Sequence, residues 1–107
     1  MQKKNVSGGV VYGSLFFMNG MCNIADTFEE EFRMNMDELK GFLDAAGSGF
    51  EHVLSATIYL KDLNDRERYL NKLWGEYFPK AAPARTCVEA GMGTCRCEIT
   101  LVAAIPE

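Results

Sequence analysis

The chain has 107 residues, of which 48% are hydrophobic and 24% charged, and its formal net charge at pH 7 is −4. This length and composition are typical of one globular domain spanning residues 1–107. The acidic balance argues against nucleic-acid binding, which needs a basic face, and no apolar run approaches the ~20 residues of a membrane span. The N-terminus lacks the apolar core and cleavage site of a signal peptide, so we expect a cytoplasmic protein.

The first half of the chain predicts a hairpin followed by a long helix. Two β-prone runs within residues 10–18 flank Gly13 and Ser14, which make a good two-residue turn. Asp26 and Thr27, followed by the glutamates 29–31, offer an N-cap and negative charge near the positive helix end. Apolar residues then recur at helical spacing until Gly47, a suitable C-cap glycine: Phe28, Phe32, Met36, Leu39, Leu43 and Ala46.

The second half predicts a strand, a helix and two more strands. Residues 52–60 form a β-rich run that is apolar on both faces, as expected for a central strand. A second helix begins near Asn64 and is stopped by Pro79, and its buried stripe includes Trp74. Two final strands are predicted to form a hairpin around the turn at residues 91–93.

The resulting order, β-β-α-β-α-β-β, predicts an α+β fold. We expect a two-layer sandwich in which two helices cover one face of a single mixed sheet. The strand–helix–strand unit at residues 52–89 should place its two strands parallel. The second face of the sheet then needs another occupant, and assembly or function should be sought there.

Three of the four cysteines lie between residues 83 and 103, where a metal site, a disulfide frame or a reactive strand surface are the alternatives. Disulfides are disfavoured in a reducing compartment. Zinc is disfavoured because no C-x-x-C knuckle is present, only Cys95 and Cys97, and His52 is the sole histidine. We therefore expect four free thiols, no metal, and Cys95 and Cys97 packed as small apolar residues.

The predicted final hairpin also sets which side chains share a face. A two-residue turn at Gly91 and Met92 pairs the two strands so that Arg85 lies opposite Glu98. That register gathers polar residues on the face away from the helices: Arg85, Cys87, Glu89, Arg96 and Glu98. The pairs have two interpretations. They are surface ion pairs, preferred for Arg96 with Glu89, or, for Arg85 with Glu98, a carboxylate-binding guanidinium beside a group that orients water.

These residues are similar to the C-terminal signature of a known family. The segment PARTCVE at 83–89, with Glu98 and Ile99 before an apolar tail, resembles the Rid/YjgF family, also called the L-PSP endoribonuclease family. The likeness extends through Leu39, Lys40, Leu43, residues 44–47, residues 59–63, Asn71, Tyr77 and Phe78. The resemblance implies a chorismate-mutase-like sandwich, assembled as a homotrimer with a cleft at each subunit interface.

The resemblance also implies an activity and the residues that carry it. Arg85 is expected to hold the substrate carboxylate and Glu98 to position the attacking water. Cys87, the backbone of Gly20 and the side chain of Asn71 are expected to line the same pocket. The implied reaction is hydrolysis of reactive 2-imino or enamine acids to 2-oxo acids and ammonia. It needs no cofactor, since a protonated imine is already electrophilic.

One departure from the family pattern supports an alternative function. Active deaminases of the family usually carry an N-terminal Gly-Pro-Tyr-Ser segment whose tyrosine enters the cleft, whereas Asn5 and Val6 stand at the Pro-Tyr position here. Tyr12 is the nearest replacement, although packing is its simpler role. The alternative is therefore a non-catalytic trimeric module that binds small carboxylates. Ribonuclease activity is disfavoured by the acidic charge.

Overall fold

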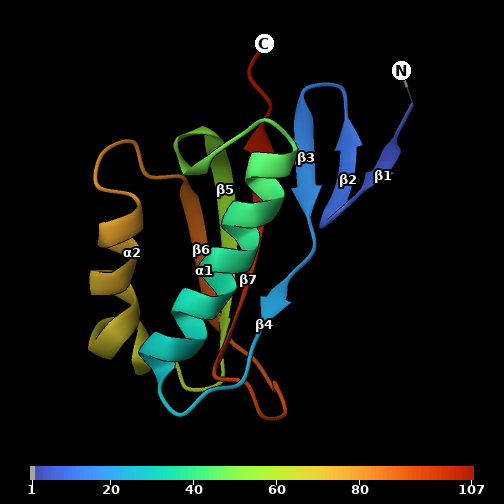
Figure 1. Cartoon of the computed structure of the whole chain (residues 1–107). Coiled ribbons are helices and arrows are strands. Elements are labelled where there is room, and N and C mark those ends of the chain that lie inside the picture. Colours follow the sequence, from blue (N-terminus) through green and yellow to red (C-terminus); the bar gives the residue numbers. More distant parts are fainter. Residues whose placement is uncertain (1) are drawn as a thin grey trace.

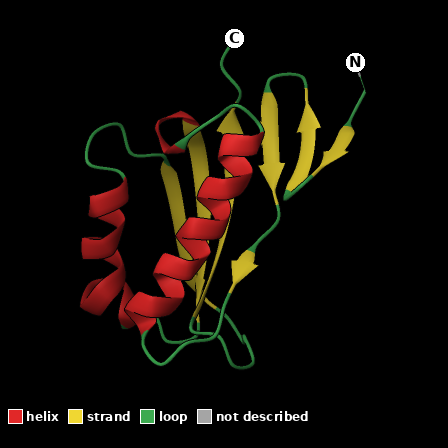
Figure 2. Ribbon diagram, in the orientation of Figure 1, coloured by secondary structure: helices red, strands yellow, loops and turns green. Residues whose placement is uncertain are grey.

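A computed structural model describes residues 2–107 and shows an α+β sandwich, with two helices on one face of a mixed sheet (Figures 1 and 2). The predicted fold class is confirmed. The strands are β1 (Lys4–Val6), β2 (Gly9–Tyr12), β3 (Leu15–Met18), β4 (Met21–Cys22), β5 (Val53–Leu60), β6 (Ala84–Glu89) and β7 (Cys97–Ala104), and the helices are α1 (Phe28–Ala45) and α2 (Asn71–Tyr77). A 3₁₀ turn (Phe50–His52) precedes β5, and a π-helical turn (Arg66–Leu70) leads into α2.

The strand order in the sheet is β1-β2-β3-β7-β5-β6, and β4 pairs with β7 beyond the end of β3. β5 and β6 are parallel, as predicted for the strand–helix–strand unit, and the other pairs are antiparallel. The strands β1 and β4 were not predicted, because runs of three and two residues are too short for alternation to be recognised.

Helix α1 begins and ends where its capping residues indicate. The backbone N–H of Glu30 donates to the Thr27 hydroxyl at 3.2 Å, which satisfies one of the unpaired amides of the first turn. Gly47, with φ +79°, adopts the left-handed conformation that follows many helices. The buried stripe of the helix contains all of the predicted apolar residues except Ala46, which is the half-buried C-cap, together with two polar ones, Glu31 and Asn35.

The core lies between the helices and the inward side of the sheet. Alternate residues of β5 and β7 point into it, and the fully buried examples include Ile58, Ile99 and Leu101. The opposite side of the sheet carries residues that alternate with these, and several are partly or largely exposed apolar side chains: Phe17 at 45%, Tyr12 at 47% and Val88 at 40%. In the following sections this side, lined by Tyr12, Phe17, Tyr59, Val88, Glu98 and Thr100, is called the open face.

The predicted hairpin between the last two strands is wrong. β6 and β7 lie on opposite edges of β5, so Leu60 has Glu89 as its partner on one side and Cys97 on the other. Because neighbouring strands lie about 4.8 Å apart, the connection at residues 90–96 must cross roughly twice that distance, past the end of β5. A turn sequence shows that the chain reverses, but it does not show whether a third strand lies between.

This topology also corrects the predicted faces. Arg85 is level with Ala56, which is 3% exposed and faces the helices, so Arg85, Cys87 and Glu89 lie on the helix side of the sheet. Glu98 is level with Tyr59 and lies on the open face, as predicted. The inward position of Cys97, Ile99 and Leu101 is confirmed, whereas Val88 and Ala84 lie on the open face.

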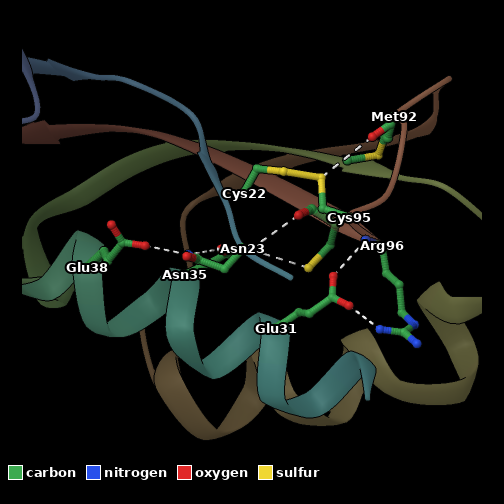
Figure 3. Close-up of a disulfide and its surroundings, with 9 residues drawn as sticks. Cys22, Asn23, Glu31, Asn35, Glu38, Met92, Cys95 and Arg96 are labelled. Carbon is green, nitrogen blue, oxygen red and sulfur yellow. Dashed lines mark hydrogen bonds and ion pairs between the residues drawn. A yellow bond between two sulfur atoms is a disulfide. The ribbon is translucent and has the colours of Figure 1, made fainter. Parts of the chain in front are cut away.

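The prediction of four free thiols is also wrong. Cys22 and Cys95 form a disulfide with a Cα–Cα distance of 6.2 Å, and the free cysteines are Cys87 and Cys97 (Figure 3). The unpredicted strand β4 is the reason, because its pairing with β7 sets Cys22 beside the residues that precede β7. No helix within residues 2–107 has the length and apolar character of a membrane span.

Candidate functional site

The guanidinium of Arg85 is held in place by helix α2. One N–H group donates to the Asn71 side-chain oxygen at 2.8 Å, and the guanidinium carbon lies 5.8 Å from the centre of the Trp74 ring. The structure therefore places two of the predicted site residues, Arg85 and Asn71, in direct contact. Arg85 is nevertheless exposed, on the edge strand of the sheet. Because a guanidinium has five N–H donors in a planar fork, Arg85 can bind a carboxylate in bidentate fashion.

Cys87 lies two residues further along β6, on the same side as Arg85, and is half-buried. Burial raises the pKa of the thiol, and the positive charges of Arg85 and Arg66 oppose that shift only in part. The thiol is therefore protonated near neutral pH and is a poor nucleophile. This arrangement fits a residue that lines a site rather than one that attacks a substrate.

Glu98 lies on the open face, in a different setting. It contributes to a cavity of about 220 Å³, together with Tyr59, Ala90, Gly91 and Met92. Tyr59 is its strand partner on β5, so the two side chains leave the same face of the sheet side by side.

Gly20 lies directly against the Glu98 side chain. A Cβ atom at Gly20 would be 2.5 Å from Glu98 Oε2 and 3.0 Å from Thr100 Oγ1. The first separation is too short for a carbon–oxygen contact, so a side chain at this position would require the Glu98 carboxylate to shift, whereas glycine does not. The structure therefore brings Gly20 and Glu98, two of the predicted site residues, together.

The five predicted site residues thus form two groups on opposite faces of one sheet. Arg85, Asn71 and Cys87 lie on the helix side, whereas Glu98 and Gly20 lie on the open face. The expectation that Arg85 lies opposite Glu98 fails because β5 separates their strands. The cavity beside Glu98 is accordingly lined by none of Arg85, Asn71 and Cys87.

The predicted ion pair between Arg96 and Glu89 is also replaced by other contacts. The Arg96 guanidinium donates to the carboxylate of Glu31, and the Arg96 backbone N–H donates to the same carboxylate at 2.7 Å (Figure 3). Glu89 instead accepts a hydrogen bond from the backbone N–H of Leu63 at 2.9 Å.

Glu31 is a buried ionic residue that the sequence interpretation missed. Its exposed fraction is 0%, and Arg96 also donates to the carbonyl oxygens of Ala25 and Asp26. The signal was present in the helix pattern, because Glu31 and Asn35 fall on the apolar stripe of α1, one turn apart. The Arg96 contacts fix the loop that enters α1 against the start of β7.

Across residues 2–107, no group of three or more His, Cys, Asp or Glu side chains is arranged to hold a metal ion. Arg85 and its neighbours offer hydrogen-bond donors for an anion, and Glu98 offers a carboxylate for a proton or a water molecule.

Comparison with known proteins gives one consistent result. The family model described as endoribonuclease L-PSP matches residues 6–105. A RutC family protein from Pyrococcus horikoshii is 38% identical over 61 residues, which cover 57% of this chain and 48% of the relative. This match, like those to the next most similar curated relatives, spans about half of the relative's length.

Two further relatives match over more of their length. A RutC family protein from Saccharolobus solfataricus is 31% identical over 91 residues, covering 78% of this chain and 71% of the relative. The crystal structure of a YjgF family member from Neisseria meningitidis superposes with a TM-score of 0.87 at 31% identity, covering 95% of this chain and 88% of that one. With nearly the whole chain matched by the family model, the protein belongs to the Rid/YjgF family, the family of the endoribonuclease L-PSP model.

Proposed function

We propose that the protein, acting as one domain over residues 1–107, hydrolyses reactive 2-imino or enamine acids to 2-oxo acids and ammonia. The observation that carries the proposal is the Arg85 guanidinium, which is exposed yet oriented by Asn71 and Trp74. A planar, pre-oriented guanidinium suits the carboxylate that all of these substrates carry.

We further propose that the active site forms between subunits of a homotrimer. Arg85 and Glu98 of one chain lie on opposite faces, so a site that uses both is most simply built from two copies of the chain. The open face supports this arrangement, because its exposed apolar residues Phe17 and Val88 need a partner surface. In such a cleft, Arg85 of one subunit would approach the open face of the next.

The chemistry needs only positioning and one proton relay. Arg85 would bind the carboxylate of the 2-imino acid, and Glu98 would accept a proton from water as the water oxygen bonds to C2. The resulting carbinolamine takes that proton back from Glu98 on its nitrogen, the imine having been bound in its protonated form. When the C–N bond breaks, ammonia leaves, the hydroxyl oxygen forms the new carbonyl, and the hydroxyl proton is released.

Glu98→Gln is expected to abolish hydrolysis while leaving the affinity for 2-oxobutanoate nearly unchanged, because the amide keeps the size but cannot accept the water proton. The test couples the protein to a threonine dehydratase and follows ammonia and 2-oxo acid release, with calorimetry for affinity. Glu67→Gln is the matched control, since Glu67 is exposed in the turn before α2. Full hydrolysis by Glu98→Gln would remove Glu98 from the mechanism.

A non-catalytic carboxylate-binding module is the second candidate, and one observation favours it. Val6, at the position of the family's tyrosine, pairs with Gly9 in the outer strands of the sheet and supplies no hydroxyl. Tyr12 does not replace it within one chain, because Tyr12 is aligned through Leu15 with Ala104, about 20 Å along β7 from Glu98. Binding of 2-oxobutanoate without hydrolysis in wild type would favour this candidate.

The oligomeric state gives a separate prediction. Light scattering at micromolar concentration is expected to find a trimer for wild type and a smaller species for Phe17→Lys, which places a charge on the open face. Met34→Lys is the control, because Met34 is 43% exposed on α1, comparable to the 45% of Phe17. A monomeric wild type, or equal behaviour of the two variants, would contradict the shared site.

A further inference from the structure

The disulfide links the short strand β4 to the start of β7, immediately beside the Glu98 group. Cys22 is the strand partner of Glu98, and Gly20, two residues before Cys22, lies against the Glu98 carboxylate. Cys95 lies just before β7 and immediately precedes Arg96 in the chain (Figure 3). The covalent bond therefore holds the segment in which Gly20 lies against the Glu98 carboxylate.

The other interactions of that segment are a short strand pairing, hydrogen bonds at its two ends and the packing of Met21. β4 contains two residues, and its strand partners are all in β7. The Asn23 side chain donates to Asn35 at 2.8 Å and also to the Glu38 carboxylate, which attaches the following residue to α1. Within residues 19–22, the Asn19 backbone N–H donates to the Gly8 carbonyl oxygen at 2.8 Å and Met21 packs against the core, whereas Gly20 has no side chain to anchor it. A two-residue strand of this kind depends on few contacts and opens more readily than the central strands.

The disulfide is open to chemical attack from one side only. Cys22 is exposed, whereas Cys95 is 3% exposed, so an incoming thiolate can reach the Cys22 sulfur. The other two thiols are unsuited to attack it. Burial raises the pKa of Cys97 to about 12, and Cys87 lies on the helix side of β6, with β5 between its strand and β7. Exchange therefore depends on an external thiol.

We propose that the Cys22–Cys95 pair is a reversible thiol–disulfide switch that controls the contact between Gly20 and Glu98. The regulatory consequence rests on the proposed function, in which Glu98 positions water. The co-reactant is a low-molecular-weight thiol of the glutathione class. Its thiolate attacks the Cys22 sulfur, the S–S bond breaks, and the Cys95 thiolate leaves and takes a proton. A second thiol molecule then attacks the mixed disulfide, which releases Cys22 and yields the oxidised thiol dimer.

After reduction, the Cys95 thiol has a hydrogen-bond acceptor close by. The Cys95 sulfur lies 3.8 Å from the carbonyl oxygen of Met92, which can accept a weak hydrogen bond from the thiol after reduction (Figure 3). Without the covalent link, β4 depends on its short pairing with β7 and on Asn23. Gly20 then moves more freely relative to Glu98, and the carboxylate loses its close contact with the Gly20 backbone. The oxidised form is the organised one.

The first measurement follows the chemistry and the mobility. Denatured protein prepared without reductant should contain two titratable thiols, Cys87 and Cys97, and four after reduction. Native protein in glutathione buffers of graded ratio should interconvert reversibly between the two forms. Hydrogen exchange of a peptide covering residues 19–27 should be about tenfold faster after reduction, whereas exchange in β5 should be unchanged.

Two variants separate the switch from general destabilisation. Cys22→Ser, without reductant, should show the fast exchange of reduced wild type and no further response to reductant. Cys87→Ser should show the same change in hydrogen exchange on reduction as wild type, because its Cys22–Cys95 disulfide is intact. Four thiols before reduction, or unchanged exchange at residues 19–27 after it, would overturn the proposal.

The activity measurement distinguishes this proposal from the proposed function. If wild type hydrolyses imine, the oxidised form should be faster than the reduced form, and Cys22→Ser should match the reduced rate. Equal rates would overturn control of the site by the switch. If no form hydrolyses imine, the proposed function fails, and the exchange experiment alone decides whether the disulfide controls Gly20 and Glu98.

Discussion

Arg85→Ala is expected to weaken the binding of 2-oxobutanoate by about 2–5 kcal/mol, the usual cost of removing one partner of a hydrogen-bonded charge pair in an interface. The ligand carboxylate would lose a bidentate partner that Asn71 and Trp74 hold in position before the ligand arrives. Isothermal titration calorimetry on the assembled protein measures this change directly.

Two controls make this measurement specific. Arg85→Lys should recover only part of the lost affinity, because an ammonium lacks the planar fork of a guanidinium. Lys72→Ala removes an exposed positive charge from the neighbouring position on α2 and should leave affinity close to wild type. Unchanged affinity in Arg85→Ala would remove the anchor and, with it, both candidate functions.

The largest expected loss of stability follows from Arg96→Ala, at about 3–5 kcal/mol, since removal of the guanidinium leaves the buried Glu31 carboxylate without its charge partner. Glu31 is 0% exposed and accepts from both the backbone and the guanidinium of Arg96. Urea denaturation followed by circular dichroism gives the free energy of unfolding. Asp37→Ala, at an exposed position on the helix that carries Glu31, should change it by less than about 0.5 kcal/mol.

A double variant tests the reason for this loss. If the cost comes from an unpaired charge, replacing both residues with apolar side chains of similar volume, Glu31→Met with Arg96→Met, should restore much of the stability. Additive losses in the two single variants, with no recovery in the double one, would show that the contacts of Arg96 with Ala25 and Asp26 dominate instead.

The sequence predicted the elements that depend on local patterns. Capping residues located both ends of α1, and the long apolar run located β5, because these signals act over a few neighbouring residues. The parallel pairing of β5 with β6 followed from the connection through α2. The family signature identified Arg85, Asn71, Gly20 and Glu98 as candidate site residues. The structure places Arg85 beside Asn71 and Gly20 beside Glu98.

The errors concern features that depend on strands far apart in the chain. The turn at residues 91–93 predicted that β6 and β7 form a hairpin. In the structure β7 pairs instead with the edge of β5 that β6 does not occupy. That one difference moved Arg85 and Cys87 to the other side of the sheet. The disulfide was missed for a related reason, because a general rule on cellular compartments says nothing about the pairing of β4 with β7.

The position of β7 at the centre of the sheet has a consequence for how the protein forms during synthesis. β7 lies between β3 and β5. Phe16 of β3 pairs with Ala103 of β7, and Ala56 of β5 pairs with Leu101 of β7, so β7 joins the two parts of the sheet. The residues of β7 emerge from the ribosome after every other strand has been made. Until then the nascent chain holds two unjoined parts with exposed strand edges, and long-range pairing of this kind folds slowly. Chaperones that bind exposed strands during translation therefore have their longest opportunity before residues 97–104 appear.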